Sequence, residues 1–202
     1  MPRVSAAYLR GRREEILAAA VRCFARDGFH RTTMHDVARE AALSSGALYR
    51  YFTSKASMVA AIASRHHAAD RRTLRAAAKG DVRQGLRRIA GEMIGRLADP
   101  AEREWRRVTV QLWSEALRDE RLMRVVRGGL EAPLATLASL VRRGQREGTL
   151  SPDLDPKATA RAAAAIFQGL VLQQAWDPEL DVAAGVRAAE ALLDALCQPP
   201  RR

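Results

Sequence analysis

Residues 32–55 read TTMHDVAREAALSSGALYRYFTSK, and this stretch decides the expected fold. Thr33 is a residue type that caps helix N-termini. Apolar residues follow it at the spacing of one helical face, at Val37, Ala38 and Ala41. Ser44 or Ser45 can cap a second helix, and Leu48 falls on the buried face of that helix. The stretch therefore predicts two short helices joined by a tight turn.

The second of these helices carries the side chains that a helix in a DNA groove needs. Small residues at its N-terminus let the backbone enter a major groove about 12 Å wide, and Gly46 allows the closest approach. Arg50 can bridge to a guanine edge or to a phosphate, while tyrosine hydroxyls and Lys55 can bind phosphates. We therefore expect DNA contacts from the following residues: Thr33, Ser44, Ser45, Gly46, Ala47, Tyr49, Arg50, Tyr51 and Lys55.

Thr32 to Lys55, followed by Met58, Val59 and Ile62, closely resembles the DNA-binding signature of the TetR/AcrR family of transcriptional regulators. In that family an amphipathic helix precedes the motif and ends much as Phe24-Ala25-Arg26-Asp27-Gly28-Phe29 does here. The resemblance implies an all-α fold with an N-terminal three-helix helix-turn-helix head and a C-terminal helical bundle. It implies about nine helices in all and assembly as a homodimer.

Two positions depart from the family pattern. Relatives usually carry glycine where this chain has Ala42, and a left-handed backbone there would cost a non-glycine residue roughly 1 kcal/mol. Whether Ala42 reshapes the turn is left open. Relatives often have lysine or another long polar residue where Ser45 stands, so Arg50 is expected to carry more of the readout.

Charge is distributed unevenly along the chain of 202 residues, whose formal net charge is +11. Residues 1–80 contain 15 Lys or Arg and 6 Asp or Glu, a net charge of +9, whereas residues 81–202 contain 19 and 17, a net charge of +2. Such asymmetry is typical of nucleic-acid binding. Because solvated helix faces and an arginine-rich composition give similar runs, the charge supports the motif and does not replace it.

Hydrophobic periodicity and breakers divide the chain into a head and a body. We expect the helix-turn-helix DNA-binding domain in residues 1–54, a linking helix from about residue 55, and a ligand-binding and dimerisation domain in residues 81–202. Gly128, Gly129 and Pro133 predict a kink or an interruption in the helix expected from about Glu120 to Glu147. No β-strand pattern is evident. The remaining helices are expected at about 9–27, 82–97, 105–117 and 156–176, and a last helix follows Asp177-Pro178 and runs to about Cys197.

The last two expected helices are too apolar to face water on every side. In relatives the equivalent helices pair with their copies in a dimer, and a two-fold dimer suits a palindromic site. Part of these faces must instead complete the core of the chain itself, and an intrachain core is the alternative for all of them. The expected interface residues are Ala162, Ala165, Ile166, Gly169, Leu170, Val186, Ala189 and Leu193.

The body of such regulators encloses an effector pocket that is coupled to the head through the linking helix. The resemblance and the aromatic and methionine content of the body predict a small apolar or aromatic effector. Core packing is the alternative for each candidate, because Trp and Met fill space in bundles. The candidate pocket residues are His66, Met93, Arg96, Trp105, Leu112, Trp113, Met123 and Phe167.

Other classes of site are weakly represented. His66 and Asp70 stand one turn apart, but two ligands make no closed metal site, so we expect no metal and no cofactor. Cys23 is expected in the core and Cys197 at a frayed end, and neither has metal-ligand or redox spacing. No signal sequence or apolar span of about 20 residues is evident, which predicts a cytoplasmic protein.

The sequence thus predicts a sequence-specific DNA-binding transcriptional regulator. We expect a repressor, released from a palindromic operator when a small molecule fills the body. A nonspecific architectural DNA-binding protein is the first alternative. An enzyme built on a helical bundle is more remote, because no phosphate loop, nucleophile elbow or zinc-protease helix is present.

Overall fold

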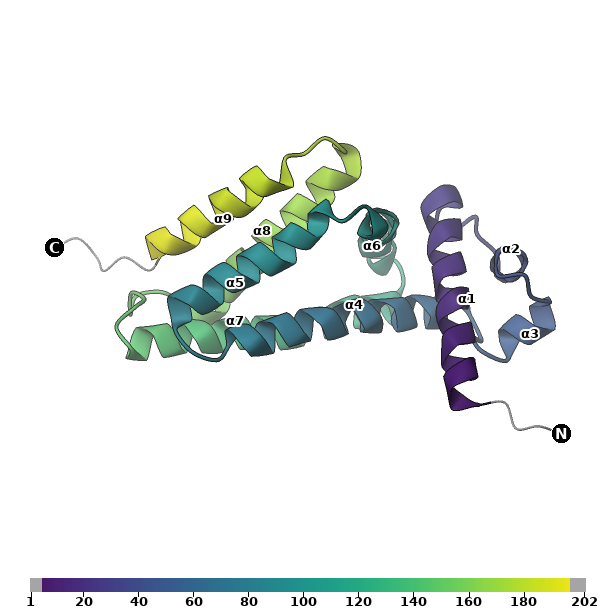
Figure 1. Ribbon diagram of the computed structural model, residues 1–202, viewed down its shortest axis with the longest axis horizontal. Helices are drawn as coiled ribbons and strands as arrows, with labels where there is room; N and C mark the ends of the chain where they lie inside the picture. Colours follow the sequence, from purple (N-terminus) through teal and green to yellow (C-terminus); the bar gives the residue numbers. More distant parts are fainter. Residues whose placement is uncertain (1–4, 197–202) are drawn as a thin grey trace. The chain divides into compact units, whose positions relative to one another are not determined.

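The computed structural model describes residues 5–196 and assigns nine α-helices to them, with no strand in that range (Figure 1). The all-α prediction is confirmed. Two short 3₁₀ turns, Arg96–Ala98 and Pro100–Glu102, separate the fifth and sixth helices. The helices are α1 Ala6–Asp27, α2 Met34–Glu40, α3 Ser45–Tyr49, α4 Lys55–Ala77, α5 Val82–Gly95, α6 Arg103–Ala116, α7 Glu120–Arg146, α8 Pro156–Trp176 and α9 Val182–Leu196.

Helix α7 is continuous, so the interruption considered at Gly128, Gly129 and Pro133 does not occur. Proline lacks the N–H that would bond the carbonyl one turn earlier, which ordinarily weakens a helix. Leu137 and Leu140, one and two turns after the proline, are almost fully buried. Tertiary packing therefore holds this helix across a residue that local preference would use to break it.

The described chain forms two compact units. The first contains the chain up to Arg65 together with Glu104–Val126, and the second contains His66–Arg103 and the chain from Arg127 onward. Helix α6 thus belongs to the same unit as the helix-turn-helix, although about 40 residues of sequence intervene. The division into residues 1–54 and 81–202 followed the order of the sequence, whereas these units follow packing.

The core of the first unit joins α1, α2, α3, the start of α4 and α6. Ile16, Phe24 and Leu48 are fully buried in it, and Val108 of α6 is buried beside them. Figure 1 shows α2 and α3 on one side of α1. This core is what holds the short α3, because a helix of its length has almost no stability of its own.

The second unit is a bundle whose core lies between α4, α5, α7 and α8. Leu74, Val82, Leu140 and Ala160 are among its buried residues. Helix α9 packs along α5 and runs in the opposite direction (Figure 1). Gly85 is required where α5 meets the end of α4, because a Cβ there would lie 2.3 Å from a backbone carbonyl oxygen.

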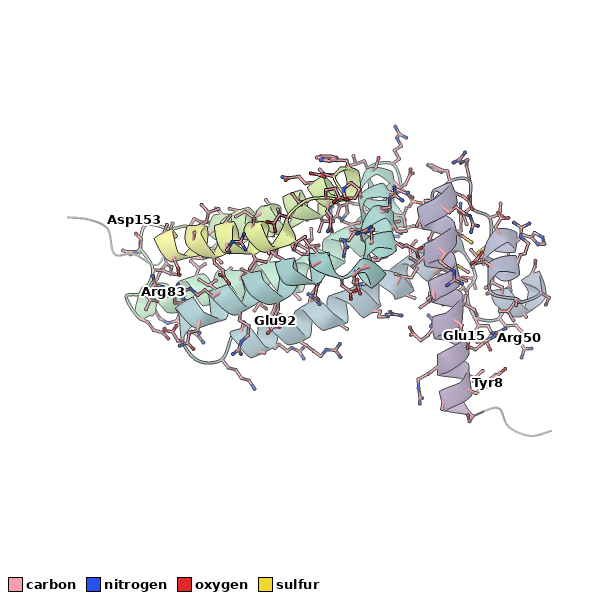
Figure 2. The ribbon with its side chains drawn as sticks, turned by 45° about the horizontal axis from the view of Figure 1, so that its top comes forward. Tyr8, Glu15, Arg50, Arg83, Glu92 and Asp153 are labelled. Carbon is pink, nitrogen blue, oxygen red and sulfur yellow. The ribbon has the colours of Figure 1, made fainter. Side chains whose placement is uncertain are left out.

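Charged contacts join α9 to α5 at the surface of the second unit. Asp194 accepts hydrogen bonds from the guanidinium groups of Arg87 and Arg83, the latter at 3.1 Å; Arg83 is labelled in Figure 2. The bonds from Arg87 are the main reason that the pKa of Asp194 lies below its usual range. Because all three side chains are partly exposed, we regard them as a guide to helix register more than as a source of stability.

Among residues 5–196, none of the helices combines the length and the apolarity that crossing a bilayer requires. Cys23 is buried in the first unit, as expected for a small core residue, and burial raises the pKa of its thiol. Cys197 lies outside the described residues.

Candidate nucleic-acid interface

Helix α2 begins with a reciprocal cap. The Thr33 hydroxyl accepts a hydrogen bond from the Asp36 backbone N–H at 3.1 Å, and the Asp36 carboxylate accepts from the Thr33 backbone N–H at 3.0 Å and from its hydroxyl at 2.6 Å. These bonds to Thr33 hold the pKa of Asp36 below its usual range. The Thr33 hydroxyl predicted to contact DNA therefore has an internal partner in the free protein.

The turn after α2 keeps the left-handed backbone that the family builds with glycine. Ala42 has φ +52°, and it is the non-glycine residue with positive φ in the described chain. The Leu43 N–H bonds the Ala38 carbonyl at 2.9 Å, and the Ala42 N–H bonds the Arg39 carbonyl at 3.1 Å. These two bonds form the usual left-handed helix end. The turn is not reshaped, so Ala42 carries the strain that glycine would avoid.

Helix α3 has a polar start, a buried middle and an exposed end. The Ser44 hydroxyl accepts from the Ala47 N–H at 3.2 Å, as expected for an N-cap. Leu48 and Phe52 are buried one turn apart, and Gly46 is exposed with nothing within 4 Å of where a Cβ would stand. The start of α3 is therefore free to approach a surface closely.

Other predicted contact residues in α3 and directly after it differ in exposure. Tyr49 is 52% exposed, and Arg50, labelled in Figure 2, is exposed at the C-cap. Ala47 is half-buried, and Tyr51 is half-buried with its side chain packed against the core of the first unit. The geometry suits Tyr49 and Arg50 for groove or phosphate contacts, whereas part of the Tyr51 ring serves packing.

His35 is a polar residue of this surface that the sequence reasoning missed. Its Nδ1 lies 3.1 Å from the Ser45 hydroxyl oxygen, so the exposed imidazole at the start of α2 meets the first residue of α3. Ser45 stands where relatives often have a long polar side chain. The only sequence signal was a polar residue two positions after a helix cap, which does not reveal a partner ten residues away.

The Lys55 ammonium group makes hydrogen bonds within the first unit. Its Nζ donates to the Phe29 carbonyl at 2.7 Å and to the His30 carbonyl at 3.2 Å, and it lies 4.7 Å from the centroid of the Phe29 ring. Burial lowers the pKa of this ammonium group. The predicted phosphate contact of Lys55 stays a prediction, but the side chain already ties the start of α4 to the link between α1 and α2.

Arg12 and Arg13 of α1 reach the two helices of the motif. Arg12 Nη2 donates to the Ala41 carbonyl at 3.3 Å, and Arg13 Nη1 donates to the Tyr51 carbonyl at 3.3 Å. Both residues fall in the first helix expected from the sequence, where they were assigned no partner. Their partners lie 29 and 38 residues away, so no local pattern could have identified them.

Helix α6 touches the same link that Lys55 holds. The Gln111 side-chain oxygen accepts from the Phe29 N–H at 3.2 Å, and the Glu115 carboxylate lies 2.6 Å from His30 Nε2. These contacts place polar groups of α6 directly against the segment that leads into α2. A displacement of α6 would therefore act on the start of the helix-turn-helix.

The predicted effector residues fall in both compact units. In the first, Trp105, Leu112 and Met123 pack in or against the core, and Trp113 is half-buried. In the second, the carboxylates of Glu102 and Asp70 pair with the side chains of His66 and Arg96 respectively. Met93 packs against the core of that unit, and Phe167 is half-buried. Core packing thus accounts for several of these side chains.

One groove of the second unit lies between the end of α4 and the C-terminal half of α7. Its volume is about 580 Å³. None of the predicted effector residues lines it. The lining residues are Arg75, Ala78, Lys79, Ala135, Thr136, Ser139, Leu140 and Arg143.

The predicted dimer residues of α8 and α9 differ in exposure. Ala162, Ala165 and Ile166 are exposed, whereas Ala189 is buried within the chain. The others are half-buried, and Leu193 packs against the core of the second unit: Gly169, Leu170, Val186 and Leu193. Exposed Leu192 and Trp176 were not in the predicted set, although they extend the apolar surface of the same two helices.

Two family models match the chain. Residues 16–62 match the model of the bacterial regulatory proteins of the tetR family, and residues 82–198 match the C-terminal domain of the BetI-type transcriptional repressors. The first match covers the helix-turn-helix with parts of its flanking helices. The second covers more than half of the chain.

Individual proteins agree with these matches. The chain is 24% identical over 164 residues, 79% of each chain, to the transcriptional regulator UidR of Escherichia coli, and 34% identical over 105 residues, 52% of this chain and 51% of the other, to the repressor Rv1474c of Mycobacterium tuberculosis. Its fold resembles that of GusR from Salmonella enterica, with a TM-score of 0.76, 22% identity and coverage of 97% and 99% of the two chains. It also resembles SmeT in complex with triclosan, with a TM-score of 0.78, 24% identity and coverage of 95% and 96%.

Proposed function

We propose a mode of action from the premise that the chain belongs to the TetR family of DNA-binding transcriptional regulators, with a C-terminal domain of the BetI repressor type. Members of this family respond to ligands, and membership identifies the protein as a transcriptional regulator and not as an enzyme. The proposal is that it represses transcription by occupying a palindromic operator as a homodimer. A small apolar or aromatic molecule would release it.

The observation that carries the operator-binding step is the form of α3. Its start is small and exposed around Gly46, its N-cap is formed, and Arg50 stands exposed at its end. A helix of this kind can insert its first turn into a major groove and present Arg50 to a guanine edge or a phosphate. Tyr49 and Ser45 would add hydroxyl contacts from the same element. Operator binding also requires the cytoplasmic location expected from the sequence.

A homodimer follows from the size of the reading element. One short helix contacts only a few base pairs, whereas two copies related by a two-fold axis contact half-sites a helical turn apart. The exposed apolar side chains of α8 and α9, including Ile166 and Leu192, support these helices as the interface. Light scattering at micromolar concentration tests this, and a monomeric mass would contradict it.

Release by an effector would act on the head through α6, in addition to the linking helix α4 expected from the sequence. Gln111 accepts a hydrogen bond from the Phe29 backbone N–H, and the Glu115 carboxylate contacts the His30 side chain. Both contacts lie shortly before the Thr33 cap of α2. A ligand that favours a position of α6 in which the head binds DNA less well must weaken DNA binding, and DNA must weaken ligand binding by the same factor. The solved complex of SmeT with triclosan supports an aromatic effector by analogy only.

The deciding experiment measures sequence preference. The wild-type protein selects duplexes from a random library, and its affinity for the selected duplex is compared with that for a random duplex at several salt concentrations. A ratio of about 10³ or more is expected for a specific regulator. A ratio near one would instead identify a nonspecific architectural protein.

Arg50→Ala tests the base contact within this experiment. We expect it to weaken binding to the selected duplex by about 1–3 kcal/mol and to relax the preference at one position of each half-site. Arg72→Ala removes the same charge from an exposed position of α4 and serves as the matched control. Equal losses on selected and random duplexes with Arg50→Ala would contradict base reading by Arg50.

A further inference from the structure

We propose that Arg12 and Arg13 are positioning residues for DNA recognition, each fixing the C-terminal end of one helix of the motif. Arg12 holds the end of α2 and the strained turn, and Arg13 holds the end of α3. Both act on backbone carbonyls from the neighbouring α1, without contacting DNA. The inference rests on the DNA-binding function stated above and assigns it two residues outside the helix-turn-helix.

Arg12 meets the turn at its most strained point. Besides the bond to the Ala41 carbonyl, its Nη2 lies 3.5 Å from the Ala42 carbonyl, and its Nη1 pairs with Glu15 of the same helix. The hydrogen bond to Glu15 raises the pKa of Arg12, and the pair fixes the direction of the guanidinium. A cation at these carbonyls also opposes the negative end of the α2 dipole.

Arg13 holds the other helix by two contacts. It donates to the Tyr51 carbonyl at 3.3 Å, and its guanidinium carbon lies 4.2 Å from the centroid of the buried Phe52 ring. Tyr51 and Phe52 are the residues whose N–H groups bond back to Leu48 as α3 ends. Arg13 thus covers the last carbonyl of this turn and stacks on its anchoring ring.

The length of α3 explains why such contacts matter for recognition. Helix α3 has five residues, so it cannot hold its own direction, and an isolated helix shorter than about 12 residues is marginal in water. Ser44 fixes its start and Arg13 fixes its end. Losing either contact would widen the range of orientations from which Arg50 approaches a base, and an error of about 1 Å already weakens site geometry.

The two roles of an arginine near DNA give different salt dependences. A phosphate contact contributes to selected and random duplexes alike, and its loss reduces the slope of log affinity against log salt by about 0.9. A positioning residue contributes only where geometry is read, so its loss lowers specific affinity and leaves the slope unchanged. Arg12 and Arg13 can therefore be assigned by titration.

The experiment uses the full chain and the selected and random duplexes described above, between about 50 and 200 mM salt. We expect Arg12→Ala and Arg13→Ala each to bind the selected duplex about tenfold more weakly, a loss of about 1.4 kcal/mol in binding. Affinity for the random duplex and the salt slope should not change. Arg10→Ala, which removes the same charge from an exposed position of α1, should leave all three quantities unchanged.

Two outcomes would overturn the proposal. If Arg12→Ala and Arg13→Ala give a shallower salt slope and weaken binding to both duplexes equally, these arginines are phosphate contacts. If Arg10→Ala reduces specificity as much as these two variants do, the effect arises from the charge of α1. Circular dichroism melts confirm that each variant is folded, and Arg12→Gln and Arg13→Gln, which keep an N–H donor without charge, should recover part of the specific affinity.

Hydrogen exchange of the free protein tests positioning without DNA. Arg12→Ala should speed exchange of the Leu43 amide, and Arg13→Ala that of the Phe52 amide, since both amides close their helix ends. Unchanged exchange at both would contradict the proposal even if the wild-type protein selected no sequence. The effect of Arg12→Ala on Leu43 should be smaller in an Ala42→Gly background, where the turn is no longer strained.

Discussion

The reading segment, residues 33–55, and the helix pair α8 and α9 are stabilised in different ways. In the reading segment, the side chains of Thr33 and Ser44 cap the first turns of α2 and α3 through hydrogen bonds to Asp36 and Ala47. In the pair, Ile166 and Leu192 leave apolar surface exposed along alanine-rich helices. A specific hydrogen bond identifies the partner of a side chain. An exposed apolar face indicates only that burial against some partner would be favourable.

The same contrast applies to charge. Residues 1–80 hold most of the net positive charge of the chain, and this charge was linked to DNA binding from the sequence. Arg12, Arg13 and Lys55 instead donate to backbone carbonyls of the first unit. Part of the basicity of this region therefore also stabilises the first unit, and a count of cations is not by itself a count of phosphate contacts.

The largest expected effect is on the free energy of unfolding, and it compares a buried leucine of the first unit with an exposed one. Leu48→Ala should lower the free energy of unfolding by about 2–5 kcal/mol, because Leu48 is fully buried and its loss leaves a cavity beneath α3. Urea denaturation measures this. Leu117→Ala is the control, since Leu117 is 79% exposed and its truncation should change stability by less than about 0.5 kcal/mol. Similar losses for both would mean that α3 is not anchored through Leu48.

The next effect tests whether a second copy covers α8 and α9. Leu192→Glu should weaken self-association by about 2 kcal/mol, roughly 30-fold, because a charge would be buried at the interface. Sedimentation velocity over a range of concentrations gives the dissociation constant. Leu117→Glu places the same charge on an exposed leucine of the first unit and should leave it unchanged. An unchanged dissociation constant for Leu192→Glu would show that this part of α9 is not in the dimer interface.

Ala42→Gly should stabilise the protein by about 0.5 kcal/mol. The left-handed backbone at Ala42 strains a residue with a Cβ, whereas glycine adopts it without strain. The relief of this strain exceeds the destabilisation caused by the greater entropy of glycine in the unfolded chain. Ala18→Gly, at an exposed position within α1, should have the opposite sign and destabilise by about 0.5–1 kcal/mol. Melting temperatures compare the two, and equal signs would show that the turn carries no strain.

The smallest effect is a pH dependence of the α2 cap. Because the folded pKa of Asp36 is lowered by its bonds to Thr33, its contribution to stability is fully present above the ordinary aspartate pKa of about 3.9 and is lost as pH falls through the folded pKa. Asp36→Asn does not titrate, so the gap in melting temperature between the wild type and this variant should shrink below about pH 4. A gap that is constant with pH would contradict the cap.

Much of the fold was readable because its signals are local. Thr33, Ser44 and Gly28 end or begin helices through bonds within four residues, and the structure places each of them as expected. The proline in α7 was misjudged as a possible interruption because packing of Leu137 and Leu140 outweighs a local preference. Local signals fail where distant residues supply the larger energy.

The candidate site was predictable to a similar extent. The exposure of Arg50 and Tyr49 follows from helical periodicity, which needs only neighbouring residues. The partners of Lys55 and the bond between His35 and Ser45 join segments that periodicity treats separately. Each of these side chains had several chemically reasonable partners, and the chain order does not rank them.

The sequence by itself determined the all-helical class, the family, the reading segment and the positions of most helix ends, because caps, breakers and periodicity act over one or two helical turns. Only the tertiary structure decided that α6 belongs to the compact unit of the helix-turn-helix, that Ala42 keeps its strained backbone, and that Arg12 and Arg13 bind carbonyls. The reason is physical: contacts across 29 or 38 residues form only after separate helices have packed on a common core.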